Sequence, residues 1–395
     1  MGVLVGWKVK GGGAAAAALV AVAACTSNPP PVVTRVKAAS PSPAATYTLP
    51  VATLPNPGGV QLDVLPRVTR PFSLLALVWD DPRDALDPVV KVRTRASASK
   101  RWSAWRILTA DDDGPQDPPA GSRGHSAPLW VGPSDAVQVA LQQPADKVKL
   151  PAGLRLALVD PGNPSQAPAP TGSGGVGVVP AVTAQAVRPG LLRAALRPTI
   201  VSRAGWHADE RLRHTAPAYA DEVHVVFIHH TVNPNGYACS QAPAIIRAIY
   251  EFHMREVRWD DIGYNFIVDR CGTIYEGRAG GVDQPVVGGH TMGFNTGSAG
   301  IAVLGTFGAG VKVPQAVIDA IARIAAWKLS SGRAGPEGKA ALVSNDSASR
   351  YPKGERVILN TISGHRDAVP TECPGDALYA ALPAIRAQAA RYSKR

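Results

Sequence analysis

The chain has 395 residues, which is enough for two ordinary domains joined by a linker. Hydrophobic residues make up 45% of it, so there is material for a core, while 39 glycines and 36 prolines indicate loops, short strands and flexible stretches. The net charge of +11 favours an anionic partner. No cluster of Lys and Arg with interleaved aromatic residues supports nucleic acid as that partner, and an anionic cell wall fits the charge equally well.

The N-terminus has the features of an export signal. Lys8 and Lys10 supply a basic start, and Gly11 to Ala24 is a small, apolar run that is too short to span a bilayer as a helix. It ends in a Val-Ala-Ala-Cys sequence at Cys25 that resembles a bacterial lipobox. We therefore predict a signal peptide over residues 1–25 and lipidation of Cys25, which would anchor the protein to the outer face of the membrane. The alternative is an ordinary signal peptide and secretion to the cell wall. In both cases the protein works outside the cytoplasm, where disulfides persist.

Residues 26–46 are rich in Pro, Ser and Ala and predict a disordered stalk. Over residues 47–160, short β-type runs alternate with turn-rich pieces, which predicts a small all-β, sandwich-like accessory domain. The runs are Ser73–Trp79, Val89–Arg95, Ala136–Leu141 and Leu154–Val159. We expect its core to include Trp79, Trp102, Trp105 and Trp130; the alternative is that an exposed Trp binds carbohydrate.

Residues 161–196 form a linker rich in Pro, Gly and Ala, and residues 197–395 have an α/β pattern. The apolar spacing from Ile245 to Phe252 predicts a helix, with Ser240 as a possible cap and Pro243 in its first turn. Two further helices and several short strands follow. Together they predict a mixed β-sheet flanked by helices. The strands are His224–Ile228, Asn265–Asp269, Thr273–Glu276 and Ile301–Leu304, and the later helices run from Val317 to Ile324, opened by Pro314, and from Leu378 to Ile385.

Three side chains in this second half have the chemistry of zinc ligands. His229 ends the apolar run Val225–Ile228, His365 follows the run Val357–Leu359, and Cys373 comes shortly after His365. Two imidazoles and a thiolate would leave a tetrahedral zinc its fourth position for a water that becomes the nucleophile. Spacing alone is weak evidence, because histidines at strand ends are often ordinary hydrogen-bonded residues.

The cysteine count adds to this argument. If Cys25 is lipidated, three cysteines remain, and an odd number leaves one thiol without a partner in an oxidising compartment. Cys239 precedes the first predicted helix and Cys271 lies in a turn between two strands, so we favour a Cys239–Cys271 disulfide and Cys373 as the ligand. The other two pairings stay open, because connectivity cannot be deduced from sequence.

Six motifs in the last half of the chain resemble the peptidoglycan recognition protein and type 2 N-acetylmuramoyl-L-alanine amidase family, and the Ala-Gly-Gly-Val-Asp run after Arg278 resembles its actinobacterial members. The resemblance runs from about Thr199 to Ala387, and the motifs occur in the family's order. They are Ser202-Arg203-Ala204-Gly205-Trp206, Phe227-Ile228-His229-His230-Thr231, Asp261-Ile262-Gly263-Tyr264-Asn265-Phe266, Tyr275-Glu276-Gly277-Arg278, Gly364-His365-Arg366 and Cys373-Pro374-Gly375-Asp376.

The resemblance implies roles for the matching residues. His229, His365 and Cys373 match zinc ligands, Tyr264 matches a tyrosine that assists catalysis, and Thr371 stands where some members have Lys, so the proton donor is the least defined role. The implied substrate is the amide between N-acetylmuramic acid and L-alanine of peptidoglycan, cut by zinc-activated water. The positions that line the family's glycopeptide cleft are matched by His230, Thr231, His253, Arg278, His290 and Asn295, although His253 could face the core instead.

Two other classes of function fit part of these features. One is a recognition protein that binds peptidoglycan without cutting it; such family members usually lack a zinc ligand and often have Ser where Cys373 stands. The other is a scaffold lipoprotein in which the all-β domain has the main role. The complete ligand set together with Tyr264 favours the hydrolase over both.

Overall fold

In the computed structural model of this chain, the described residues are 42–51, 54–56, 59–61, 63–86, 89–111, 114–115, 118–142, 150–163, 197–332 and 334–394. The predicted signal peptide with Cys25, most of the predicted stalk and most of the predicted linker lie outside them. In the described part of the chain, no helix has both the length and the apolar character needed to cross a membrane. From Ser42 onward the described residues belong to one compact unit.

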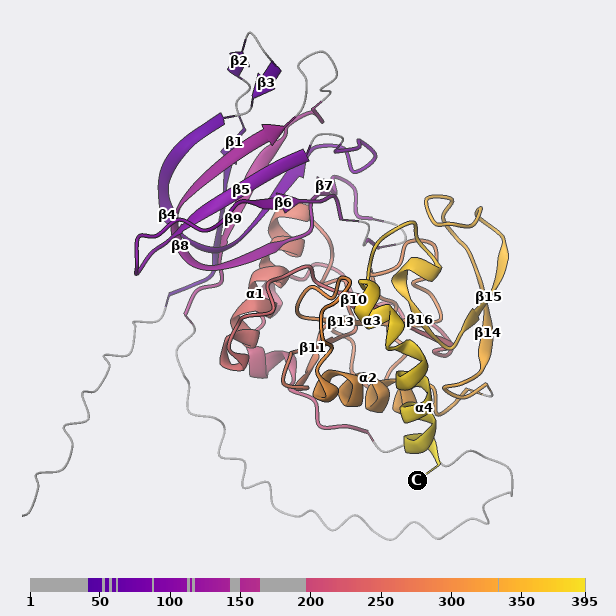
Figure 1. Ribbon diagram of the computed structural model, residues 1–395. Helices are drawn as coiled ribbons and strands as arrows, with labels where there is room; N and C mark the ends of the chain where they lie inside the picture. The colour runs from indigo at the N-terminus through magenta and orange to yellow at the C-terminus, as the bar shows by residue number, and fades with distance from the viewer. Residues whose placement is uncertain are drawn as a thin grey trace, which may run out of the picture. The chain divides into compact units, whose positions relative to one another are not determined.

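The first part of this unit is antiparallel β-structure, as predicted (Figure 1). Its strands are hydrogen-bonded into one seven-stranded sheet in the order β1-β9-β4-β8-β5-β6, with β7 paired to β4. Two strands, β2 (Leu54–Asn56) and β3 (Gly59–Gln61), form a separate hairpin. The sheet strands are β1 (Ala45–Pro50), β4 (Asp63–Trp79), β5 (Val89–Ala96), β6 (Arg106–Leu108), β7 (Gly124–His125), β8 (Leu129–Gln142) and β9 (Arg155–Asp160).

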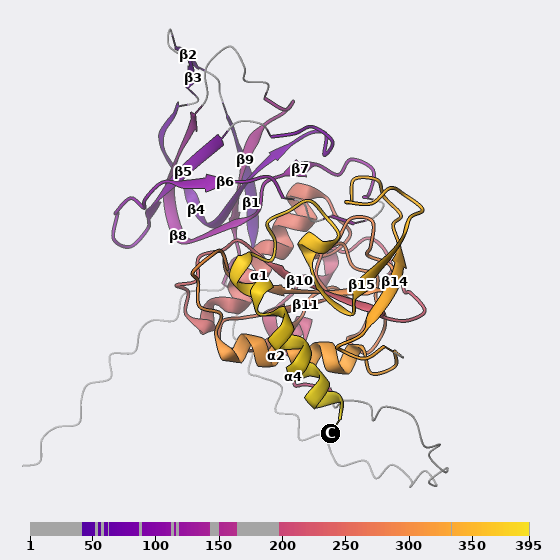
Figure 2. The ribbon, with the colours of Figure 1, turned by 45° about the vertical axis from the view of Figure 1, so that its right-hand side comes forward.

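A single sheet serves this domain because β4 and β8 are long and irregular. The pairing of β4 with β8 shifts register three times between Val64 and Leu74, and such bulges bend a strand and increase its twist. The last part of β4 also pairs with β9. Figure 2 shows β4 and β8 among the curved strands of this domain. The all-β prediction is confirmed, and one bent, hydrogen-bonded sheet stands where two sandwich layers were predicted.

Of the four tryptophans predicted to lie in the β-domain core, Trp79 and Trp130 are buried. The prediction is wrong for Trp105, which is 40% exposed, and only partly right for Trp102, which is half-buried. Both lie close to β6 in the chain, and β6 is the edge strand of the sheet within the described residues. The Arg93 guanidinium lies 5.2 Å from the Trp102 ring centroid and 4.8 Å from that of Trp105, so a surface cation–π contact replaces core packing.

The second part contains the predicted mixed sheet, which the structure confirms. Five strands follow the order β12-β11-β13-β10-β16, with β11 and β12 antiparallel and the remaining pairs parallel. A separate hairpin joins β14 (Lys339–Val343) to β15 (Arg356–Asn360). The sheet strands are β10 (Val225–His230), β11 (Phe266–Val268), β12 (Ile274–Glu276), β13 (Ser298–Val303) and β16 (Ile362–Gly364).

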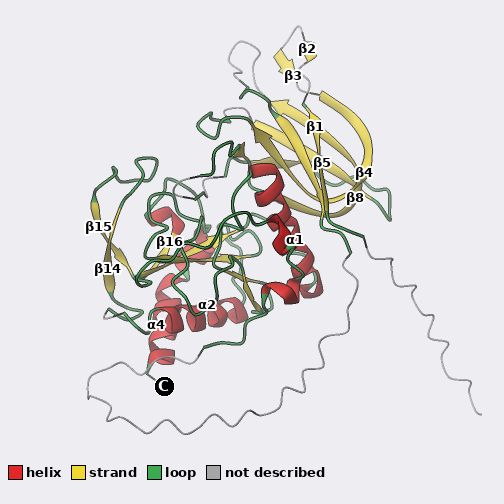
Figure 3. Ribbon diagram, turned by 180° about the vertical axis from the view of Figure 1, so that it is seen from behind, coloured by secondary structure: helices red, strands yellow, loops and turns green. Residues whose placement is uncertain are grey.

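Helices cover both faces of this sheet (Figure 3). Along and just after β13, Ala302 and Leu304 pack in the cluster that contains α1 (Ala242–Glu251), while Ile301 and Val303 pack in the cluster that contains α2 (Gln315–Lys328) and α4 (Leu382–Ser393). Alternate strand residues point to opposite faces, so α1 lies on one side and the other two helices on the other. A six-residue π-helical segment (Phe252–Val257) continues α1, and the short α3 (Asp376–Ala380) precedes α4.

The first helix begins as its sequence predicts, except at its cap. Pro243 stands in the first turn, where a missing N–H costs nothing. Ser240 lies instead inside a 3-10 turn, Cys239–Gln241. Gln241 occupies the cap position, but its side chain accepts the Ala238 N–H at 2.9 Å and does not cap α1. The residues of α1 that face the core, including Ile245 and Ile249, are buried.

The β-domain and the α/β part share a hydrophobic core. Leu74, Ala76 and Val78 of β4 belong to the same buried cluster as α1, while Leu75 and Leu77 pack into the β-domain's own cluster. The last part of β4 is therefore buried on both faces, which explains the continuous apolar run from Leu74 to Trp79.

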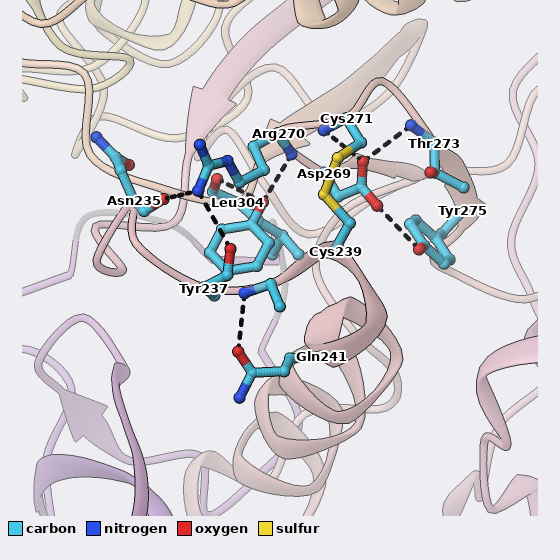
Figure 4. The surroundings of a disulfide bond; sticks show 11 residues. Asn235, Tyr237, Cys239, Gln241, Asp269, Arg270, Cys271, Thr273, Tyr275 and Leu304 are labelled. Carbon is cyan, nitrogen blue, oxygen red and sulfur yellow. Dashed lines mark hydrogen bonds between the residues drawn. A yellow bond between two sulfur atoms is a disulfide. The ribbon is translucent and has the colours of Figure 1, made fainter. Parts of the chain in front are cut away.

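A disulfide joins Cys239 to Cys271, the pairing favoured from the sequence (Figure 4). It links the turn before α1 to the turn between β11 and β12. The buried Asp269 carboxylate holds this second turn: it accepts hydrogen bonds from the Cys271 N–H and the Thr273 N–H, each at 2.9 Å, and from the Tyr275 hydroxyl at 3.1 Å. The disulfide is thus attached to a well-bonded turn.

Candidate active site

The three predicted metal ligands meet at one edge of the mixed sheet. Their candidate ligand atoms all lie within 4.8 Å of one another, and the three side chains are buried. The Cys373 Sγ is 3.8 Å from the His229 Nδ1, and the rings of His229 and His365 have centroids 4.4 Å apart. Residues separated by 144 positions in the chain are therefore brought into one cluster.

Strand pairing explains why the two histidines meet. The strands β10 and β16 are parallel neighbours, and Ile228 pairs with Gly364. The residue that follows each member of this pair in the chain is a predicted ligand. His229 and His365 therefore lie at the same end of the sheet, where the carboxyl ends of parallel strands place functional side chains. The sequence interpretation had joined His365 to the run Val357–Leu359, but that run belongs to β15 in the separate hairpin.

Backbone hydrogen bonds position Cys373 between β16 and α3. Its carbonyl accepts the Arg366 N–H at 3.0 Å, and its own N–H donates to the Thr371 Oγ1 at 3.2 Å. The His230 N–H donates to the Cys373 Sγ at 3.3 Å. A backbone donor aimed at the sulfur stabilises its thiolate form, which is the form that binds a metal.

The other ring nitrogen of His229 has a partner that the sequence did not reveal. The Thr291 Oγ1 lies 3.4 Å from the His229 Nε2 and 2.9 Å from the His290 Nδ1. Because the opposite nitrogen, Nδ1, faces Cys373, the Thr291 hydroxyl sets the orientation of the His229 ring, as partners behind metal ligands generally do. Thr291 lies next to His290 in a Gly-rich loop, but no motif distinguishes it from an ordinary loop threonine.

This donor set fits zinc. Two imidazole nitrogens and one sulfur, buried and mutually close, match the ligand types and the open fourth position of catalytic zinc sites. Among the described residues, Cys239, Asp269 and Cys271 also lie close enough to hold an ion, but both sulfurs are in the disulfide and cannot act as thiolates.

Tyr264 lies beside the candidate metal group. Its ring centroid is 5.6 Å from that of His229, and the side chain is almost fully buried. The backbone at Tyr264 packs tightly against Gly277, where a Cβ atom would come within 2.2 Å of the Tyr264 carbonyl oxygen. Glycine at this position of the Tyr-Glu-Gly-Arg motif is therefore what lets the two segments approach and holds the tyrosine in place.

A cavity of about 330 Å³ opens over the ligands, and His230, His365, Thr371 and Cys373 are among the residues that line it. The Thr371 oxygen accepts the Cys373 N–H, so its own hydroxyl proton is not used in that bond. The cavity is large enough for part of a ligand, and its lining includes the polar side chains of His230, His365 and Thr371.

The other predicted cleft residues are held by contacts within the protein. The Thr231 Oγ1 accepts the Gly305 N–H at 3.2 Å. The His253 ring packs against Trp259, with centroids 4.5 Å apart, and its Nδ1 accepts the Gly263 N–H at 3.3 Å.

The remaining predicted cleft residues, Arg278, His290 and Asn295, also have hydrogen-bond partners within the protein. The Arg278 guanidinium donates to the Ile262 carbonyl at 3.3 Å, and burial lowers the pKa of Arg278. Asn295 organises the Gly-rich loop, because its Oδ1 accepts the His290 N–H at 2.8 Å and the Thr291 N–H at 2.9 Å.

A buried ion pair, also absent from the sequence predictions, supports the Tyr264 segment. The Arg203 guanidinium donates to Asp261 at 3.1 Å and to Glu210 at 2.7 Å. The Asp261 carboxylate also accepts the Ile262 N–H at 2.7 Å and the Ala279 N–H at 3.0 Å. It thereby ties the segment before Tyr264 to the one after Arg278.

Comparison with known proteins matches two regions of the chain to separate families. Residues 31–171 match the family described as Rv3811 N-terminal galactose-binding domain-like. Residues 219–376, which include all three candidate ligands and Tyr264, match the N-acetylmuramoyl-L-alanine amidase family.

Individual relatives agree with the second match. The chain is 32% identical over 186 residues to peptidoglycan-recognition protein SC2 of Drosophila simulans, which covers 46% of this chain and 84% of that protein. It is 28% identical over 157 residues to human N-acetylmuramoyl-L-alanine amidase, covering 39% of this chain but only 23% of that protein. A solved structure, a variant of Drosophila PGRP-LB in complex with tracheal cytotoxin, is 27% identical with a TM-score of 0.34, covering 46% of this chain and 90% of that one. The chain belongs to the peptidoglycan recognition protein and N-acetylmuramoyl-L-alanine amidase family.

Proposed function

We propose that this protein is a zinc-dependent N-acetylmuramoyl-L-alanine amidase that hydrolyses the amide between N-acetylmuramic acid and L-alanine in peptidoglycan. The observation that carries the proposal is the buried convergence of His229, His365 and Cys373. His365 and Cys373 line an open cavity, and Tyr264 lies beside His229. A chain that only recognises peptidoglycan has no need of a complete ligand set.

The protein's own groups have separate tasks in this reaction. Bound zinc would supply a Lewis acid and lower the pKa of a water molecule. The Tyr264 hydroxyl is the group that would donate a hydrogen bond to the amide carbonyl oxygen as negative charge develops on it. Thr371 lines the cavity with a hydroxyl proton that its bond to Cys373 does not use, so it is our candidate for protonating the leaving amine.

A digest of purified peptidoglycan tests the proposal. We expect the full chain to release stem peptides that begin with L-alanine, and we expect neither Cys373→Ala nor His229→Ala to do so. His224→Ala is the matched control, because that histidine lies outside the cluster with its side chain 44% exposed. Equal release by wild type and Cys373→Ala would overturn the zinc mechanism.

The second candidate is a recognition protein that binds peptidoglycan without cutting it. Several relatives favour it, because they are named as peptidoglycan-recognition proteins. The same digest separates the two: this candidate predicts that wild type sediments with peptidoglycan while the supernatant contains no free stem peptide.

We also propose that the protein is exported and anchored through Cys25, a residue outside the described part of the chain. Its lipobox-like sequence supports this proposal. A clickable fatty-acid analogue should label the wild type in a bacterial host and leave Cys25→Ser unlabelled; equal labelling of the two would contradict lipidation at this cysteine.

A further inference from the structure

Residues of the all-β domain reach the cavity over the candidate metal group. Thr109, Ala110 and Asp111, which follow β6, line it together with Ala127, which follows β7, and Cys373 lies in the same lining. The cavity is therefore bounded on one side by a domain that the sequence presented as a separate accessory.

This part of the β-domain is internally braced. The Ala127 N–H donates to the Thr109 carbonyl at 2.9 Å, and the Asp111 N–H donates to the His125 carbonyl at 3.1 Å. The two lining stretches are thus bonded to each other, and β7 joins them to β4 of the main sheet. The wall is therefore hydrogen-bonded to the seven-stranded sheet through β7.

The wall is also fixed onto the amidase part. The Arg123 N–H donates to the Val257 carbonyl at 3.1 Å. The buried His125 ring packs edge-on against Phe252 and Trp259, with centroid distances of 5.7 and 5.3 Å. These contacts join the wall to the π-helical turn after α1 and to Trp259, whose ring packs against that of His253.

A further hydrogen bond connects the wall to the loop behind the ligands. The Gly114 carbonyl accepts a hydrogen bond from the Asn295 Nδ2 at 3.0 Å. The same Asn295 side chain holds the N–H of Thr291, whose hydroxyl faces His229. The β-domain therefore contacts both the open side and the back of the candidate active site.

Asp111 gives this wall a polar group. Its carboxylate lies 3.7 Å from the His125 Nδ1, and its side chain is 13% exposed. A carboxylate accepts hydrogen bonds strongly, and a stem peptide presents backbone N–H donors. Glu372 also lines the cavity, but its side chain is 96% exposed and is held less firmly.

We propose that the all-β domain forms a substrate-contacting wall of the amidase cleft, in which Thr109 and Ala127 shape the space over the metal group and Asp111 accepts a hydrogen bond from an N–H of the stem peptide. The inference rests on the proposed amidase function and deepens it, because both domains then select the substrate. Asp111 is a positioning residue for the bound peptide.

Filling the cavity from the β-domain side tests the wall. Ala127→Trp and Thr109→Trp place an indole there, and Val68→Trp on the exposed surface of β4 is the matched control, since Val68 is 76% exposed. Thr109 is itself exposed, so its variant is expected to fold even where Ala127→Trp does not. In the full chain we expect each cavity variant that folds to raise KM for soluble peptidoglycan fragments at least tenfold, and we expect Thr109→Trp to do so with zinc content and Tm unchanged.

The carboxylate is tested by comparing Asp111→Ala with Asp111→Asn. We expect a loss of about tenfold in kcat/KM, expressed mainly in KM, for the alanine variant, and near wild-type values for the asparagine variant, whose amide oxygen still accepts a hydrogen bond. If Asp111 acted only through its charge on His125, both variants would be equally impaired, which would overturn the proposed contact. Asp80→Ala is the control: Asp80 is an ion-paired acid of the same domain, outside the cavity lining, bonded to Arg155 at 2.9 Å.

Binding of a muramyl tripeptide to chelator-treated protein separates this inference from the amidase proposal. Suppose that wild type does not cut peptidoglycan, and that Ala127→Trp or Thr109→Trp still weakens tripeptide binding tenfold. The amidase proposal then fails and the wall stands. If wild type cuts peptidoglycan while all cavity variants match it in both KM and tripeptide Kd, the wall is wrong and the amidase proposal stands.

Discussion

Replacing both Cys239 and Cys271 by serine is expected to lower the free energy of unfolding substantially. The bond joins residues 32 positions apart in the chain. On the loop-closure account, a cross-link over that length removes about 12 cal/mol/K of entropy from the unfolded chain, or roughly 3.7 kcal/mol at 25 °C. A domain of ordinary stability would lose a large part of its margin.

The folded state should change little in this variant. The Asp269 carboxylate keeps its three hydrogen bonds in the turn beside Cys271, and the Tyr237 hydroxyl still accepts the Arg270 N–H at 2.7 Å. The loop that the disulfide closes contains α1 and Tyr264, but the two sulfur atoms are not part of the candidate active site. We therefore expect zinc content and activity per folded molecule to stay near wild type.

Urea unfolding followed by far-UV circular dichroism measures the effect. The double variant should unfold at lower urea with a loss of about 3–4 kcal/mol, and reducing the wild-type disulfide should give the same loss. Reductant added to the double variant controls for effects on Cys373, the remaining thiol among the described residues. A loss below about 1 kcal/mol would refute the loop-closure reasoning.

Three further predictions concern buried polar groups and packing. Asp269→Ala removes the acceptor of three hydrogen bonds and should cost about 2–4 kcal/mol in urea unfolding, whereas a cost near zero would mean that water replaces the carboxylate. Trp206→Ala should cost about 3–5 kcal/mol by the same measurement, because Trp206 is fully buried and its Nε1 donates to the Glu276 carbonyl at 2.7 Å; a cost below about 1 kcal/mol would contradict its place in the core. Burial lowers the pKa of Lys328 from 10.5 to about 8, so the unfolded chain binds this proton more tightly and folding gains up to about 3 kcal/mol as pH rises from 8 to 10.5. Lys328→Met should lack that gain, and parallel stability curves for the two proteins across this window would contradict the shift.

The strands that the sequence predicted are those whose burial pattern is local. Val90 and Val92 alternate with polar residues, and Val225–Ile228 is a continuous buried run, so their state could be recognised from their neighbours alone. Trp105 failed as a core prediction because its burial depends on whether another strand covers β6. The run Val357–Leu359 before His365 is a strand, but it pairs with β14, and the short β16 that leads into His365 was not predicted.

The residues of the candidate site also fall into two groups, those that the sequence marks and those that only the folded structure brings to the site. His229, His365 and Cys373 have chemistry and neighbouring motifs that mark them in the sequence. Thr291 and Asp111 carry no such mark, because their roles arise only when distant segments are packed together. Asp111 in particular comes from another domain, and no spacing within the amidase motifs could have pointed to it.

The central claim is that this chain cuts peptidoglycan with one zinc held by His229, His365 and Cys373. The most direct test is to strip the full-length protein of metal with a chelator, verify its removal by elemental analysis, and return zinc in known amounts while measuring stem-peptide release. We predict that activity is lost on stripping and returns in proportion to bound zinc up to one per chain. Metal-free protein that releases stem peptides at the untreated rate would contradict the claim.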